Sequence, residues 1–142
     1  MRLLLEAINT KSAEKLSDYL KARDTLKQML SPDDYRYFSF QLWKEGIARY
    51  TEYQVAQWAA AKYQPTREFQ TLKDFTTFSA AADQQRDLIV HELSTLKLKN
   101  YKRVAFYPIG AAEGLLLDQS NPKWRSRYFA EKFDNSSYFS RK

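Results

Sequence analysis

Apolar side chains recur every three to four residues along most of this chain, which is the spacing of an amphipathic helix. In the first thirty residues this spacing is kept by Leu16, Tyr19, Leu20, Leu26 and Leu30. The triplet Ser12-Ala13-Glu14 is typical of a helix start, because a hydroxyl cap precedes an acid in the first turn. The pattern predicts helix over residues 1–30, with a break near Asn9 and Thr10.

The segment Ser31-Pro32-Asp33-Asp34 predicts a second helix start. Serine caps a helix, proline suits the first helical position, and two acids in the first turn favour the positive end of the helix dipole. We expect this helix to run to residue 63, because Gln64-Pro65-Thr66 ends it and starts the next one.

The remaining segments also predict helices. Apolar positions keep an approximate helical period over residues 66–98, with a local irregularity at Thr76-Thr77. Pro108 marks a helix that runs through Leu115-Leu116-Leu117 to Asp118. A short last helix follows Asn121-Pro122 and carries Trp124, Tyr128, Phe129 and Phe133. From Asn135 onward we expect a fraying tail.

These elements predict an all-α fold, an irregular multi-helix bundle, formed by residues 1–142 as a single domain. A length of 142 residues is enough for one buried core. The chain has only three glycines and four prolines, which favours long helices over many short strands. Without cysteine it has neither a disulfide framework nor a thiol site.

The formal charge of +6 does not by itself indicate a nucleic-acid binder. The 23 basic residues are scattered among 17 acids, and no run of five like charges occurs. The most basic stretch, residues 97–103, is typical of a helix C-terminus, where cations favour the dipole. We therefore do not expect nucleic acid as the partner.

No targeting signal is visible in this sequence. The apolar run that begins at Met1 ends at Glu6, too early for a signal peptide, and no stretch is long enough to span a membrane. We expect a soluble protein of undetermined compartment and oligomeric state.

The glycines lie in two motifs that otherwise predict helix. Gly46 belongs to Leu42-Trp43-Lys44-Glu45-Gly46-Ile47-Ala48-Arg49-Tyr50, and the other two belong to Tyr107-Pro108-Ile109-Gly110-Ala111-Ala112-Glu113-Gly114. Glycine inside a helix costs about 1 kcal/mol relative to alanine. Its use here predicts close approach of another group.

Together the two motifs resemble the C-terminal helical half of the gluzincin zinc metallopeptidases. In that family, a helix with Glu-Gly-x-Ala-x-Tyr supplies the third zinc ligand, and a later Tyr-x-x-Gly-Ala segment supplies a tyrosine that stabilises the oxyanion. The resemblance implies that Glu45 is the zinc ligand and that Tyr107 is the oxyanion donor. It extends over residues 6–133 and implies that the chain forms one wall of a cleft for a peptide or protein substrate.

Each of these residues also has an ordinary structural interpretation. Glu45 and Arg49 are spaced i and i+4 with the acid first, which favours an ion pair on a helix surface. Tyr107 precedes Pro108 and fits either a cleft at a helix entrance or the core, with its hydroxyl satisfied. The spacing alone leaves these alternatives open.

The chain departs from the family at one decisive point, because no His-Glu-x-x-His motif is present. The only histidine, His91, is followed by Thr95 where the second histidine would stand, and it comes after Glu45 rather than before it. One carboxylate cannot hold zinc, so we expect no metal in this chain alone and no hydrolysis by it.

Two explanations remain open. In the first, the chain is the C-terminal part of a longer enzyme whose N-terminal subdomain carries the histidines; the apolar start at Met1, which falls within a predicted helix, favours this one. In the second, a complete protein keeps the helical shell without the metal centre. The alternative function is a helical protein-interaction or ligand-binding module without enzymatic activity, in which exposed aromatic residues form a patch for a partner.

Overall fold

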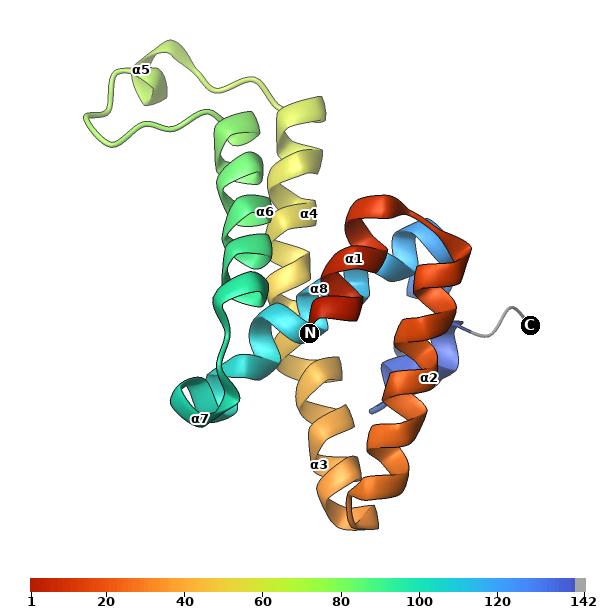
Figure 1. The fold of residues 1–142 in the computed structure, drawn as a ribbon. Coiled ribbons are helices and arrows are strands. Elements are labelled where there is room, and N and C mark those ends of the chain that lie inside the picture. Colours follow the sequence, from red (N-terminus) through yellow and green to blue (C-terminus); the bar gives the residue numbers. More distant parts are fainter. Residues whose placement is uncertain (140–142) are drawn as a thin grey trace.

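The computed structural model describes residues 1–139, and these residues form helices and connecting turns without a β-strand (Figure 1). The all-α prediction is therefore confirmed for the described part of the chain. The longer helices are α1 (Arg2–Thr10), α2 (Ala13–Met29), α3 (Pro32–Gln41), α4 (Ile47–Lys62), α6 (Phe78–Thr95) and α8 (Phe106–Ser120). Short elements connect and follow them: η1 (Leu42–Gly46), α5 (Arg67–Gln70), α7 (Leu98–Tyr101), η2 (Lys102–Ala105), η3 (Trp124–Arg127) and η4 (Asn135–Phe139).

The helix starts in the first half of the chain lie where the sequence predicted them. The Ser12 hydroxyl accepts a hydrogen bond from the Lys15 amide and caps α2, and the Ser31 hydroxyl accepts one from the Asp34 amide and caps α3. The break after α1 is made by Lys11, whose φ of 54° is left-handed. These local signals suffice because each cap satisfies amide groups that the first helical turn leaves free.

The predicted helix over residues 31–63 has the expected extent but not the expected regularity. Between α3 and α4 lies η1, a π-helical turn that contains Glu45 and Gly46. In this turn the Ile47 amide donates to the carbonyl of Leu42 rather than to that of Trp43. The Trp43 carbonyl accepts a hydrogen bond from the Tyr128 hydroxyl instead, at 2.7 Å. The bulge is thus stabilised by a residue 85 positions away.

The prediction of helix over residues 66–98 is only partly correct. Helix α5 is one short turn, residues 71–77 are not helical, and α6 begins only after Thr77, whose hydroxyl caps it. Phe69 and Leu72, two of the apolar positions within residues 66–98, are 45% and 51% exposed. Helices α4 and α6 pack side by side as an arm that carries this segment at its tip (Figure 1).

The end of the described chain is more ordered than the sequence suggested. Helix α8 begins at Phe106, two residues before Pro108, and η3 is a short 3-10 turn rather than an α-helix. The prediction of a fraying tail from Asn135 is wrong for the described residues, because Asn135 and Tyr138 in η4 are fully buried. Residues 140–142 of the predicted tail lie outside the described residues.

Helix α8 is the centre of the bundle and packs against α1, α4, α6 and η1. It is buried on nearly all sides, since nine residues of its fifteen are buried. A helix apolar around its whole circumference is expected at the centre of a core.

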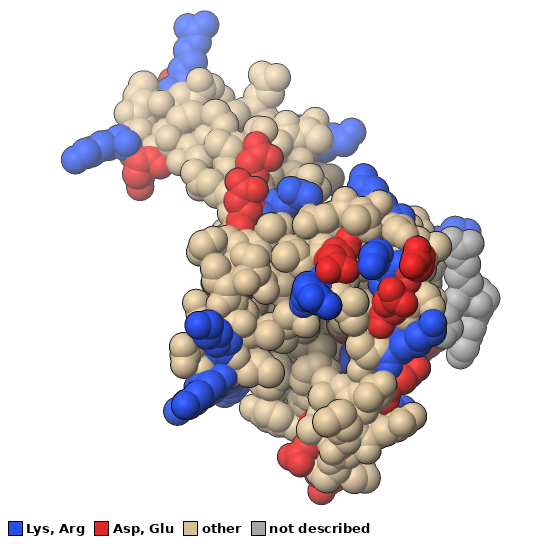
Figure 2. Space-filling model, viewed as in Figure 1, with Lys and Arg blue, Asp and Glu red and all other residues tan. Residues whose placement is uncertain are grey.

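The charged side chains are scattered over the surface. Lysine, arginine and acidic side chains are interspersed over the face drawn in Figure 2, in agreement with the scattered charges of the sequence. None of the helices in the described residues is long and apolar enough to cross a membrane.

Candidate functional site

The two glycine motifs cross at direct backbone contact. A Cβ atom placed on Gly46 would lie 2.3 Å from the Cα of Gly110, and one placed on Gly110 would lie 2.6 Å from the Cα of Gly46. Such distances leave no room for any side chain, so the prediction of close approach is confirmed at this pair. Because Gly46 follows Glu45 and Gly110 lies one turn after Tyr107, the crossing fixes the backbone of both candidate residues.

The two motifs make a second close contact, between Gly114 and the ring of Tyr50. A Cβ atom on Gly114 would lie 2.6 Å from the Tyr50 ring. The Tyr50 hydroxyl donates to Asp118 at 2.7 Å and accepts a hydrogen bond from Arg125. Burial first, and then the hydrogen bond to Asp118, raise the pKa of Tyr50 well above its ordinary value. Tyr50, the last residue of the first motif, therefore stays protonated and packs against Gly114 of the second motif.

Glu45 lies at the crossing with one oxygen engaged and the other free of described partners. Its side chain is 11% exposed, and Oε1 accepts from the Arg103 guanidinium at 3.1 Å. Its Oε2 is buried and has no hydrogen-bond partner among the described residues. A buried carboxylate oxygen normally has a donor or a cation beside it. Glu45 therefore has spare capacity for one further ligand.

Tyr107 has a different neighbour. The guanidinium of Arg49 lies over its ring, 5.8 Å from the centroid, and Arg49 also pairs with Glu92 at 3.4 Å and Glu52 at 3.7 Å. The alternative ion pair between Glu45 and Arg49 is not among the described ion pairs, since Glu45 pairs with Arg103 and Arg49 with Glu52 and Glu92. Arginines thus contact both candidate residues, but no described contact joins Glu45 directly to Tyr107.

The most buried charged cluster was missed in the sequence. Glu113 on α8 is fully buried, and its Oε1 lies 2.9 Å from Nε of Arg23 on α2. The Tyr19 hydroxyl also donates to Oε1, while the Asn135 amide donates to Oε2 at 2.9 Å. The only signal in the sequence was an acid within an apolar Gly-Ala-Leu segment. Its partners come from segments far apart along the chain, so no local spacing reveals them.

Burial and charge set the ionisation of this cluster. Burial is the largest influence and lowers the pKa of Arg23, but Glu113, the Tyr19 and Tyr35 hydroxyls and Asp134 together outweigh it, so the pKa is raised and Arg23 stays charged. The pKa of Tyr19 is raised by burial and by the negative charge of Glu113, which keeps its hydroxyl protonated. Asp134 gives Arg23 a second acid at 3.2 Å. Each of these side chains has at least one partner within the cluster, which is typical of a structural cluster, although Nε of Arg23 and Oδ1 of Asn135 make no hydrogen bond to a described residue.

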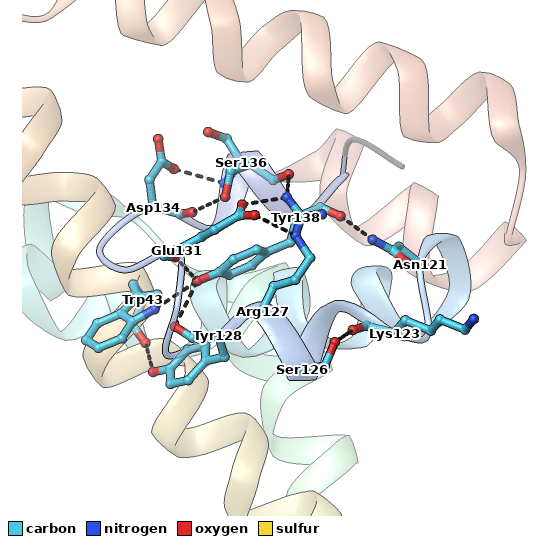
Figure 3. Close-up of polar contacts among 11 residues, drawn as sticks. Trp43, Asn121, Lys123, Ser126, Arg127, Tyr128, Glu131, Asp134, Ser136 and Tyr138 are labelled. Atoms are coloured by element: carbon cyan, nitrogen blue, oxygen red, sulfur yellow. Dashed lines mark hydrogen bonds and ion pairs between the residues drawn. The ribbon is translucent and has the colours of Figure 1, made fainter. Parts of the chain in front are cut away.

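The C-terminal segment contacts η1 at Trp43, as Figure 3 shows. The Trp43 indole stacks on Tyr128 with centroids 4.7 Å apart, and its Nε1 donates to the Tyr138 hydroxyl at 3.1 Å. The Tyr138 hydroxyl in turn donates to the Glu131 carbonyl, and Asn121 donates to the Tyr138 carbonyl at 2.8 Å. These contacts join the C-terminal segment to Trp43 of the π-turn.

The described residues do not form a metal site by themselves. No group of three or more histidine, cysteine, aspartate or glutamate side chains within residues 1–139 is placed to hold an ion. His91 lies exposed on α6 and belongs to no such group. A zinc ion would need ligands from outside these residues in addition to Glu45.

No protein-family model, curated protein or solved structure matches the chain. Function is therefore inferred from the geometry of the described residues together with the resemblance of the two motifs.

Proposed function

We propose that this chain is a helical metallopeptidase-like module that contributes Glu45 and Tyr107 to a zinc site of the gluzincin type and forms one wall of its peptide-binding cleft. The histidines that complete the site come from polypeptide outside these residues. By itself the chain is catalytically incomplete.

The observation that carries this proposal is the buried, unpartnered Oε2 of Glu45 at the crossing of the two glycine motifs. An ordinary surface ion pair would leave that oxygen in water, where it needs no partner. A carboxylate that keeps one oxygen dry and unpaired on a rigid helix suits a ligand to a cation that is supplied elsewhere.

Tyr107 would act through its hydroxyl. It is half-buried in the first turn of α8, and the contact of Gly46 with Gly110 fixes that turn relative to Glu45. The positive charge of Arg49 lies 5.8 Å from the centroid of the Tyr107 ring, which favours donation by the phenol toward a developing negative charge. The role proposed for Tyr107 is hydrogen-bond donation to the tetrahedral intermediate.

The test begins with the genomic sequence upstream of the codon for Met1, where we expect an in-frame His-Glu-x-x-His. The protein made from the whole reading frame should contain about one zinc per chain, and Glu45→Gln should lower that content, while Glu52→Gln, an exposed acid of α4, should not. An upstream frame without the motif, or full zinc retention in Glu45→Gln, would reject the proposal.

A second candidate function, a helical interaction module, is favoured by exposed apolar residues on the arm. Trp58 is 66% exposed and Val55 is 59% exposed on α4, whereas Trp124 is buried in the core. Sedimentation velocity over a range of concentrations tests one form of this function, association between copies. Association that Trp58→Ser abolishes would support this function, and a chain that stays monomeric would exclude association between copies.

A further inference from the structure

An apolar pocket of about 380 Å³ lies between α1, α2, α3, α7 and α8, and neither Glu45 nor Tyr107 lines it. This volume falls in the range of about 300–1,000 Å³ that is usual for small-molecule sites. Its wall is made mainly of aliphatic and aromatic side chains, among them Leu4, Leu26, Leu30, Phe38 and Ile109. In Figure 2 the surface between α2, α3 and α7 is mostly tan, which agrees with this composition.

The pocket is a continuation of the core toward the surface. Leu4 at its inner end is 1% exposed and belongs to the main hydrophobic cluster. Leu26 and Leu30 are half-buried, and Leu98 of α7, which also lines the pocket, is 57% exposed. A slender apolar molecule could therefore enter beside Leu98 and extend toward Leu4 while it stays in contact with hydrocarbon.

The floor of the pocket offers no free charge. Two polar residues, Tyr19 and Arg23, belong to the lining, and both are engaged in the cluster around Glu113. Arg23 lies 2.9 Å from Glu113, 3.2 Å from Asp134, and donates to the Tyr35 hydroxyl at 3.3 Å. A charged group placed there would lose its hydration without gaining a partner. The inner end therefore suits the apolar end of a ligand.

The segment that brings Leu98 to the mouth is basic. Leu98 stands between Lys97 and Lys99, both exposed, and the sequence from residue 97 to residue 103 contains four basic residues and no acid. Blue side chains project over α7 at the lower left of Figure 2. An anionic group at the mouth would keep most of its hydration and gain attraction from these lysines.

We propose that this pocket binds a free long-chain carboxylate, with its hydrocarbon tail between α2 and α3 and its carboxylate beside Lys97 and Lys99. The proposal does not depend on the peptidase-like function, because the two sites share no residue. In this proposal the basic stretch at residues 97–103 binds the carboxylate head group, in addition to the helix-terminus role that its sequence indicates.

Calorimetric titration of the whole chain with laurate, kept below its micelle concentration, tests the proposal. We expect saturable binding of one laurate per chain and clearly weaker binding of dodecyltrimethylammonium, which has the same tail with a cationic head. Absence of saturable laurate binding would overturn the proposal, and so would equal affinity for the two amphiphiles, because the lysines would then have no role.

Matched variants locate the bound molecule. Ala22→Trp should fill the pocket and weaken laurate binding by about tenfold or more, while Ala60→Trp on the exposed face of α4 should leave it unchanged. Lys97→Glu with Lys99→Glu should weaken binding by about fivefold, against no change for Lys62→Glu with Lys73→Glu. The comparison of the two lysine double variants keeps the test decisive if Ala22→Trp does not fold. Laurate affinity that is the same in every folded variant would contradict the assignment.

Discussion

Two glutamates of this molecule, Glu45 and Glu113, are both largely withdrawn from water but differ in the partners of their carboxylate oxygens. Glu113 on α8 is surrounded by Arg23, Tyr19 and Asn135, so both of its oxygens have partners. Glu45 in η1 has one partner, the mostly exposed Arg103, and one buried oxygen without any. The first arrangement stabilises a fold, whereas the second leaves a group available for something else.

The difference follows from where each residue sits. Glu113 belongs to a straight helix at the centre of the bundle, where any unpaired charge would be costly. Glu45 belongs to a π-turn at the margin, and π-turns inside helices often occur at functional positions. The exposure of the two side chains differs modestly, 0% for Glu113 and 11% for Glu45, and their hydrogen-bond partners separate them more clearly.

The largest effect is expected from Glu113→Gln. This change leaves Arg23 buried with a single acid, Asp134, and should lower the free energy of unfolding by about 3 kcal/mol. The same change at Glu45 should cost less than about 0.5 kcal/mol, because its partner is exposed. Urea unfolding of both variants measures this contrast. Equal losses would remove the distinction between the two glutamates.

A smaller but more specific effect is expected at the crossing that positions Glu45. Glycine to alanine inside a helix ordinarily stabilises it by about 1 kcal/mol. Gly46→Ala and Gly110→Ala should instead each destabilise the fold by about 2 kcal/mol, since the new Cβ would collide with the opposite backbone. Thermal unfolding gives the sign directly. A stabilising Gly110→Ala would mean that the helices do not touch there.

Tyr19→Phe should cost about 1.5 kcal/mol at neutral pH, because Glu113 loses one donor. It should also change the dependence on pH. The pKa of Tyr19 is raised in the folded state, so the unfolded chain releases this proton first, near the ordinary tyrosine value of about 10. Stability that Tyr19 contributes is therefore complete below pH 10 and decreases above it. Urea unfolding between pH 9 and pH 11 should show a shallower decline in Tyr19→Phe, and an unchanged slope would contradict the assignment.

The smallest effect is expected from Arg103→Ala. Its side chain is 63% exposed, so loss of the pair with Glu45 should cost about 0.5 kcal/mol or less. A matched Arg36→Ala removes a similarly exposed partner of Asp33. A much larger loss at Arg103 would mean that Glu45 depends on this arginine and is structural, as Glu113 is.

The sequence predicted what depends on near neighbours along the chain. The caps at Ser12 and Ser31, the break after α1 and the all-α class follow from hydroxyl, proline and apolar spacing, which act within one or two turns. The close approach at Gly46 and Gly110 was also predicted, since only a packing need explains glycine in these helices. The roles of Glu45 and Tyr107 remain predictions that rest on the motifs.

Only the tertiary structure decided the rest. The π-turn at Glu45 exists with a carbonyl bound by Tyr128, and the Glu113 cluster joins residues from α2, α8 and η4. The apparent tail at Asn135 became core for the same reason. In each case the stabilising partner lies far away in sequence, so local propensity carries no information about it, and burial is decided only once the helices pack.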